Sequence, residues 1–353
     1  MLTTDDVTHF GDSCEWTGVT NANTEAWLQA RREILTASDV ACILGEAPES
    51  WGSAYKVYVA KICPPEPEEV TINSPLFWGA KLEQTILSET AAYYGWEYHP
   101  GGALLRSKKH PWLGCTLDAE IDRGRDWETM EGKTSQVTRA WDEEEEKLPN
   151  HVLIQAHSQL LVTGAPCNVV FALLVGCRPC QIDIEPNASL ASVIIEKGEE
   201  FMDRVRRMDP PDPDHTDASK KALERMYSGE TGNAVQLPKV ATEWALELVN
   251  LIEESKVNER RQNQIRNLLR QSIGHASYGL LDEEVDGKRF FSWKTDKRGA
   301  RTLRHVKHGP YVPEGFALPE ASPIRTLVDD LRDSVAANEV TAPIKRSRRR
   351  NRR

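Results

Sequence analysis

Apolar residues recur with the three-to-four spacing of amphipathic helices through much of the first 210 residues. Thr24 is a candidate N-cap for the first of these helices, Thr36 or Ser38 for the second, and Gly45 closes the second. The spacing predicts helices near 24–31, 36–45, 51–62, 74–95, 150–164 and 190–208.

Shorter segments are β-branched, alternating or continuously apolar, as strands are. They are Trp96–Leu105, Trp112–Ile121, the segment with Glu131 and Lys133, Cys167–Val175 and Gln181–Ile184. Interleaved with helices in this order, they predict a mixed α/β fold with a three- or four-stranded central sheet flanked by helices. We expect residues 1–22 to be irregular and the proline-rich run at 210–215 to be a boundary.

The pattern changes after residue 215. Ala241–Ser272 predicts a long, highly charged helix whose apolar positions suit a coiled-coil arm or a helical hairpin. Two further runs flank Asp286-Gly287, a dipeptide typical of β-hairpin turns. This basic, aromatic hairpin either packs as an ordinary hairpin or contacts nucleic acid by stacking. We therefore expect a helical arm and hairpin over 215–340 and a disordered basic tail over 341–353.

Composition narrows the classes of protein. The 353 residues carry a net charge of −10, and seven positive charges lie in the last nine residues, so the body is strongly acidic. An acidic body is not typical of a protein that coats nucleic acid, but it permits one that holds DNA in a narrow channel. No apolar run reaches about 18 residues and the N-terminus has no signal-peptide pattern, so we expect no membrane span and no secretion. The seven cysteines are expected to be free thiols, with zinc or redox use of Cys177 and Cys180 as the alternative.

The stretch Leu113–Ser135 is the most informative, and we interpret it as a β-hairpin. Glu131 and Lys133 are two positions apart and share a face, and in the usual register Asp118 comes alongside them. Two adjacent carboxylates repel each other unless a divalent cation lies between them, and Mg²⁺ suits such a site. The alternative is an ordinary set of strand charges, and Asp122 competes with Asp118 as the ligand.

Three further features are candidates for binding or catalysis. Arg31 and Ser38 lie where two helices join, which predicts an anion site; the alternative is an ordinary capped helix pair. Gln155 and Gln159 share one face of an apolar helix, where the backbone or phosphate of a bound strand would satisfy their amides. Glu83 lies at the edge of its helix's apolar stripe and either reaches the metal or is a surface carboxylate.

Five ordered blocks together resemble the λ-exonuclease-like, or YqaJ-type viral recombinase, branch of the PD-(D/E)XK nuclease superfamily. The blocks are WLQARREILTAS, WGAKLE, LGCTLDAEI, EGK and QAHSQLLVTG, within about residues 23–205. Leu117-Asp118-Ala119 stands where the family usually has Pro-Asp-Gly, which changes backbone freedom at the turn but keeps the carboxylate. The resemblance implies a PD-(D/E)XK nuclease domain over 23–210.

The resemblance also implies a role for each candidate residue. It assigns catalysis to Asp118, Glu131, Lys133, Glu83 and Gln155, metal ligation to Asp118, Glu131 and the Gly132 carbonyl, and phosphate or DNA binding to Arg31, Ser38 and Gln159. Lys133 would assist the attacking water, while Arg31 and Ser38 would grip the 5′-phosphate end.

Family members digest one strand of duplex DNA from its 5′ end and leave 3′ single-stranded tails for annealing. The resemblance therefore implies a phage recombination exonuclease of the host cytoplasm that uses Mg²⁺, with Mn²⁺ substituting. It further implies double-stranded DNA ends as substrate, a ring-shaped trimer or tetramer, and a single-strand annealing protein as partner. The alternatives are an endonuclease of the same superfamily and a non-catalytic module that binds DNA ends.

Overall fold

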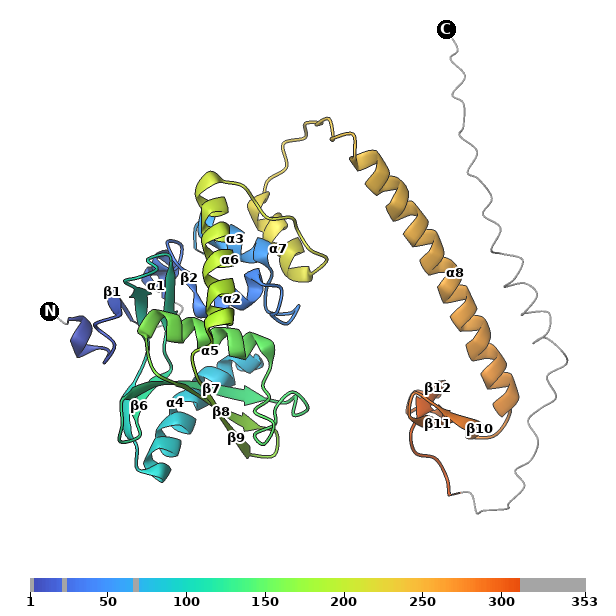
Figure 1. Ribbon diagram of the computed structural model, residues 1–353. Coiled ribbons are helices and arrows are strands. Elements are labelled where there is room, and N and C mark those ends of the chain that lie inside the picture. The colour runs from blue at the N-terminus through green and yellow to red at the C-terminus, as the bar shows by residue number, and fades with distance from the viewer. Residues whose placement is uncertain (1–2, 21–23, 66–69, 312–353) are drawn as a thin grey trace, which may run out of the picture. The chain divides into compact units, whose positions relative to one another are not determined.

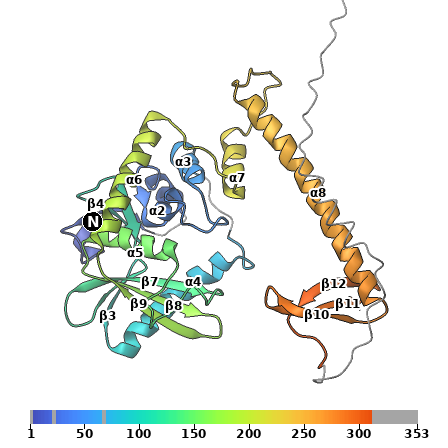
Figure 2. The same cartoon turned by 45° about the vertical axis from the view of Figure 1, so that its right-hand side comes forward.

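The computed structural model describes residues 3–20, 24–65 and 70–311. The chain divides into two compact units, Met1–Gly232 and Asn233–Arg353, which are described separately below. The predicted mixed α/β class is confirmed in the first unit (Figures 1 and 2). No helix among the described residues combines the length and apolar character that crossing a membrane requires.

The helices of the first unit begin and end close to the predicted positions. Thr24 caps the first α-helix by accepting a hydrogen bond from the Trp27 N–H at 3.2 Å. Ser74 and Pro75 begin the longest helix of the first hundred residues, and Gly95, with φ of 71°, ends it. The helices are η1 (Thr4–Asp6, a 3₁₀ helix), α1 (Glu25–Ala30), α2 (Ala37–Ile43), α3 (Ala54–Ile62), α4 (Pro75–Tyr94), α5 (Asn150–Thr163), α6 (Ala188–Arg207) and α7 (Asp217–Met226).

A five-stranded mixed sheet lies between α4 and α5 (Figure 1). Its strand order is β3 (Glu97–Pro100), β6 (Ala119–Asp122), β7 (Trp127–Ser135), β8 (Asn168–Leu174) and β9 (Arg178–Ile184). Within this sheet β7 and β8 pair in parallel, and the other neighbouring strands pair antiparallel. Val169 and Phe171 of β8 pack with α4, whereas Val170 and Ala172 join the core that includes α5. Because β8 is buried on both faces, its sequence is apolar from Val169 to Leu174.

A second, four-stranded sheet has the order β1 (Cys14–Thr20), β4 (Ala103–Ser107), β5 (Leu113–Thr116) and β2 (Leu35–Thr36). The expectation of an irregular N-terminus is wrong for β1, which pairs antiparallel with β4. The seven residues of β1 alternate only weakly between buried and exposed, so their pattern gave little sign of a strand.

Two predicted strands are each broken where the chain passes from one sheet to the other. Trp96–Leu105 becomes β3 and β4, with the break at Gly101-Gly102, and Trp112–Ile121 becomes β5 and β6, with the break at Leu117-Asp118. The two breaks contact each other: the Gly101 N–H donates to the Asp118 carbonyl at 3.1 Å. A Cβ at Gly101 would lie 2.0 Å from the Leu117 carbonyl oxygen, so this crossing requires glycine. The prediction of a single three- or four-stranded sheet was therefore too simple, because apolar residues continue through both breaks.

The first unit extends beyond the expected boundary at 210–215. Helix α7 packs on α3, where the Ser219 hydroxyl donates to the Ser53 hydroxyl at 2.9 Å and the Tyr55 hydroxyl donates to the Met226 sulfur at 3.5 Å. The unit therefore ends at Gly232, and the proline-rich run is a connection within it.

The second unit contains helix α8 (Ala241–Ile273) and a three-stranded antiparallel sheet of β10 (Tyr278–Val285), β11 (Lys288–Thr295) and β12 (Arg301–Val306). Asp286 and Gly287, with φ of 51° and 65°, form the predicted turn between β10 and β11. The expected hairpin is thus present, but a third strand extends it. The basic tail at 341–353 lies outside the described residues.

Candidate active site

Asp118 and Glu131 approach each other because β6 and β7 pair with Ala119 opposite Met130. Asp118 directly precedes β6, and its Oδ2 accepts a hydrogen bond from the Gly132 N–H at 2.9 Å. The structure therefore brings Asp118 beside the strand that carries Glu131 and Lys133, in the arrangement expected from the sequence.

Three side chains donate hydrogen bonds to the Glu131 carboxylate, which is 1% exposed. The Lys133 ammonium and the Gln155 Nε2 donate to Oε1, the latter at 2.6 Å. The Gln159 Nε2 donates to Oε2 at 2.5 Å. These charge-assisted bonds fix the orientation of the carboxylate.

Gln159 is 1% exposed, and both ends of its amide are engaged. Its Oε1 accepts a hydrogen bond from the Asn168 Nδ2 at 2.6 Å, and Asn168 also donates to the Thr129 hydroxyl at 2.7 Å. Because its amide is buried and already hydrogen-bonded, Gln159 offers no accessible group for the expected contact with a bound strand. The contacts of Gln159 are those of a side chain that orients Glu131.

Glu83 reaches the same cluster from α4. A Cβ placed on Gly132 would lie 3.2 Å from the Glu83 Cγ, so the absence of a side chain at Gly132 allows the helix to come this close. Burial and the nearby Glu131 raise the pKa of Glu83 to about 7. Burial, Glu131 and Glu83 together raise the pKa of Asp118 well above its usual range.

The cluster is suited to a divalent cation. Three carboxyl groups share it with one ammonium, that of Lys133. Burial lowers the pKa of Lys133, but Glu131 and Asp118 outweigh this effect and the net direction is upward. Burial and the neighbouring carboxylates both raise the pKa values of Asp118 and Glu83, and a hard cation bound by these oxygens would favour their charged forms.

Two residues outside the cluster, Gln84 and Tyr98, hold the backbone of Asp118 through hydrogen bonds, and the sequence did not indicate either of them. The Tyr98 hydroxyl donates to the Gln84 Oε1 at 2.8 Å, and the Gln84 Nε2 donates to the Asp118 carbonyl at 2.8 Å. Gln84 is adjacent to Glu83, but nothing in its spacing predicted this contact. For Asn168 a signal existed, since it is a polar residue that opens an otherwise apolar strand.

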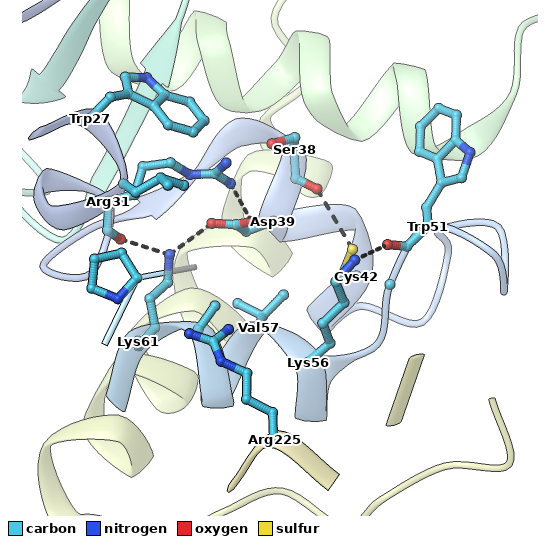
Figure 3. A pocket seen from close by; sticks show the side chains of 14 residues that line it. Trp27, Arg31, Ser38, Asp39, Cys42, Trp51, Lys56, Val57, Lys61 and Arg225 are labelled. Atoms are coloured by element: carbon cyan, nitrogen blue, oxygen red, sulfur yellow. Dashed lines mark hydrogen bonds and ion pairs between the residues drawn. The ribbon is translucent and has the colours of Figure 1, made fainter. Parts of the chain in front are cut away.

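Arg31 and Ser38 line a cavity of about 300 Å³ between α1, α2, α3 and α7 (Figure 3). Four cationic side chains line it against a single carboxylate: Arg31, Lys56, Lys61 and Arg225 against Asp39. Lys56, Lys61 and Arg225 were not recognised from the sequence, because they lie far from Arg31 along the chain. The excess of positive charge favours an anionic ligand.

A partly buried network of charged side chains lines this cavity. Asp39 accepts hydrogen bonds from the Arg31 Nη2 at 2.6 Å and from the Lys61 Nζ at 2.8 Å (Figure 3). Burial alone would raise the pKa of Asp39, but Arg31 and Lys61 outweigh it and hold the pKa below its usual range. Thr36, and not Ser38, is the N-cap of α2, and its hydroxyl accepts a hydrogen bond from Arg31 at 2.7 Å. Arg31 is thus held in place and is not simply solvated.

The cavity and the acid cluster are linked through His151 at the start of α5. Trp51, which lines the cavity, lies edge-on to His151 with ring centroids 4.6 Å apart. Burial and then the charge of Lys133 lower the pKa of His151. One imidazole therefore lies near both the cavity wall and the ammonium of the acid cluster.

Residues 26–166 match the family model of the YqaJ-like viral recombinase domain. This range includes every site residue predicted from the sequence. A search of the curated protein sequences gave no match.

Among solved structures, the chain is similar to an alkaline exonuclease, LHK-Exo, from Laribacter hongkongensis, with 17% identity and a TM-score of 0.42. That match covers 58% of this chain and 98% of LHK-Exo, and the complex of LHK-Exo with dAMP gives the same values. A phage-related exonuclease from Haemophilus somnus 129PT matches with 13% identity and a TM-score of 0.40, over 50% of this chain and 94% of that chain.

Proposed function

We propose, from the premise that residues 26–166 form a YqaJ-like viral recombinase domain, that the chain is a metal-dependent exonuclease of phage recombination. It would digest linear double-stranded DNA from the 5′ end and leave 3′ single-stranded tails. The observation that carries this proposal is the convergence of Asp118, Glu131 and Lys133 beside a cationic cavity. The first set suits phosphodiester hydrolysis, and the second suits a terminal phosphate.

In the proposed mechanism Asp118 and Glu131, with the Gly132 carbonyl, would hold Mg²⁺, for which Mn²⁺ would substitute. The ion would lower the pKa of bound water and stabilise charge on the attacked phosphate. Lys133 supplies an ammonium on the same face, where it orients the water or neutralises developing charge. Gln155 keeps the Glu131 carboxylate turned toward Lys133 through its 2.6 Å hydrogen bond, while Glu83 adds a third carboxyl group.

The cavity explains why digestion would proceed from an end. Arg31 and Ser38 would contact the terminal 5′-phosphate, and Lys56, Lys61 and Arg225 supply the remaining positive charge. A cavity of about 300 Å³ lined by four cationic side chains has room for a terminal phosphate, which favours the exonuclease over the endonuclease alternative. Each cut would create a new 5′-phosphate for the same cavity.

The remaining features of the proposal concern assembly. We propose that the chain forms a ring-shaped trimer or tetramer in the host cytoplasm and that a single-strand annealing protein is its partner. The second unit, with its long helix α8 and three-stranded sheet, would serve assembly or this docking.

Digestion of three matched substrates tests the function: linear duplex with 5′-phosphate, linear duplex with 5′-hydroxyl, and closed circular duplex. With Mg²⁺ we expect rapid digestion of the first, slower digestion of the second and none of the third. Arg31→Ala should remove the preference for 5′-phosphate, since a charge-assisted contact contributes about 1.5–3 kcal/mol, roughly ten- to a hundredfold in rate. Arg207→Ala, on the exposed end of α6, is the matched control.

Asp118→Asn and Lys133→Ala should each lower digestion by at least about a hundredfold, because each removes charge from the reacting site. Circular dichroism would establish that both variants are folded. Wild-type rates in either folded variant, or rapid cleavage of the circular substrate, would contradict the proposal.

A further inference from the structure

A second cluster of metal-binding side chains lies outside the acid cluster. His9 follows η1, His99 is on β3, and Glu120 is on β6 directly opposite His99. One ligand atom from each of the three lies within 4.8 Å of the others. A search of the described residues for three or more histidine, cysteine or acidic side chains this close together finds this group alone.

Glu120 is 1% exposed and has an unusual set of partners for a buried carboxylate. Its Oε1 accepts a hydrogen bond from the Thr8 hydroxyl at 2.5 Å, and its Oε2 accepts one from the His9 N–H at 2.9 Å. Within the described part of the chain, its ion-pair partners are imidazoles alone: His9 Nδ1 at 2.8 Å and His99 Nδ1 at 4.0 Å. No arginine or lysine there balances its charge. Buried carboxylates are normally paired with a charged group or coordinate a metal, and here two imidazoles occupy the positions of such partners.

His99 provides an independent sign of a missing ligand. Its Nδ1 is buried and has no hydrogen-bond partner, although it points toward Glu120. A buried imidazole nitrogen without a partner is costly, and a metal ion would satisfy it. The His9 ring is held in position by stacking on Trp127, with centroids 3.5 Å apart and planes within 6°.

The distances are close to those of a tetrahedral site. Bonds of 2.0–2.1 Å to imidazole and carboxylate place neighbouring ligand atoms about 3.3 Å apart. The distances from the Glu120 Oε2 to the His9 Nδ1 and the His99 Nδ1, 2.8 and 4.0 Å, lie on either side of this value, and the ligand atoms of all three residues lie within 4.8 Å of one another. Two imidazoles and one carboxylate suit Zn²⁺ and similar transition metals better than Mg²⁺, which prefers oxygen ligands. The Thr8 hydroxyl on the second carboxylate oxygen resembles the outer hydrogen bonds that orient metal ligands.

We propose that His9, His99 and Glu120 bind one Zn²⁺-type ion, with water in the fourth position, separately from the acid cluster. The ion joins the N-terminal segment before β1 to the edge of the five-stranded sheet. His9 lies outside the matched range 26–166, so the proposed metal site includes a residue that is not part of the family domain. Its effect is to stabilise the folded chain, because an ion that binds only the folded state shifts the unfolding equilibrium.

Titration of the metal-stripped full-length chain with Co²⁺ tests the site, since tetrahedral Co²⁺ absorbs visible light and competes with Zn²⁺. We expect one such ion per chain in the wild type and in Asp118→Asn, which lacks a carboxylate of the acid cluster. His9→Gln and His99→Gln should each weaken binding at least about tenfold, because each removes a direct ligand. His215→Gln is the matched control, since His215 is exposed and pairs with Glu49.

Thermal unfolding with and without Zn²⁺ gives a second readout. Zn²⁺ should raise the Tm of the wild type, Asp118→Asn and His215→Gln, but not of His9→Gln or His99→Gln. The His9 side chain is 35% exposed, and glutamine keeps an amide that can donate to Glu120, so the metal-free fold of His9→Gln should stay intact. Equal Co²⁺ affinity in all five proteins would overturn the proposal, as would loss of the Co²⁺ band in Asp118→Asn with its retention in the histidine variants. Because neither readout uses nuclease activity, the result is independent of the proposed function.

Discussion

Glu131 is the residue on which the acid cluster depends. Its carboxylate is buried and accepts hydrogen bonds from Lys133, Gln155 and Gln159. Asn168 in turn holds the Gln159 amide, so a chain of polar groups extends from β8 to the proposed metal ligand. Such outer contacts set the orientation of a ligand before the metal binds, which favours a single coordination geometry.

Replacing Gln159 with leucine should show this role. Gln159→Leu leaves the Glu131 Oε2 without its side-chain donor, which should cost about 1–3 kcal/mol of stability. Mg²⁺ affinity should fall by about ten- to a hundredfold, as for other outer-contact losses. Urea unfolding and a Mg²⁺ titration of digestion rate measure the two effects. Gln271→Leu on exposed α8 is the control, and equal behaviour of the two variants would contradict the role.

The acid cluster should also make stability depend on pH. Burial and Glu131 raise the pKa of Glu83 from its ordinary 4.5 to about 7, so the folded chain keeps a proton that the unfolded chain has lost. In metal-free protein the stability contributed by this group therefore falls as pH rises from 4.5 to 7. Glu83→Gln removes that loss, so the variant should gain stability relative to wild type across this window. Urea midpoints in EDTA at pH 5 and pH 7.5 measure it, and a constant difference would refute the assignment.

At the scale of elements, the approach of α4 to β7 brings Glu83 to the cluster. This approach depends on Gly132, where an added Cβ would lie 3.2 Å from both the Glu83 Cγ and a Leu87 methyl group. Leu87 is fully buried in the core between α4 and the sheet, so it has little room to move. The close packing of this helix on this strand therefore sets the spacing between two carboxyl groups.

Gly132→Ala should push α4 away from β7. We expect a loss of about 1–3 kcal/mol from overpacking and a lower digestion rate. Gly79→Ala on α4 is a matched control, because the added Cβ would lie no closer than 3.9 Å to its nearest neighbour, the Thr134 Oγ1. That substitution should be neutral or add about 0.5–1 kcal/mol through helix propensity. Denaturant midpoints distinguish them, and similar midpoints for the two variants would argue against tight packing at Gly132.

The elements also show which features were predictable from the sequence. Helix ends were predictable because caps such as Thr24 and Gly95 act within a few residues. The breaks at Gly101 and Leu117 were not, since they depend on contact between two chain segments that cross. Likewise, the proximity of Glu131 and Lys133 followed from spacing alone. The partners of Gln159 and of Glu120 did not, because Glu120 bonds to residues 111 and 112 positions away.

At the scale of the molecule, the buried apolar clusters of the described residues lie in one of the two units. Every residue of the three buried apolar clusters found among the described residues lies within the first unit, up to Met226. The acid cluster, the cationic cavity and the histidine cluster also lie there. The second unit instead exposes many large apolar side chains along α8, including Trp244, Leu248 and Leu251. The proposed function therefore places catalysis in the first unit and assembly in the second.

A chain shortened to residues 1–232 should therefore fold by itself. We expect a single cooperative transition by calorimetry and retained Mg²⁺-dependent digestion of short linear duplex, because the core and the site are complete in this unit. If the second unit serves assembly, light scattering should show a smaller oligomer for the shortened chain than for the full chain. Failure of the shortened chain to fold would contradict the independence of the units.

The crossing of the chain between its two sheets has a mechanical consequence. Asp118 lies at the seam where β5 of one sheet gives way to β6 of the other, and the opposite crossing at Gly101 is bonded to its backbone. A shift of one sheet relative to the other would therefore move Asp118 away from Glu131, even if the hydrogen bonds between strands within each sheet stayed intact. If the proposed nuclease function is correct, the rigidity of this seam, more than the melting of any single strand, would determine the temperature at which digestion is lost.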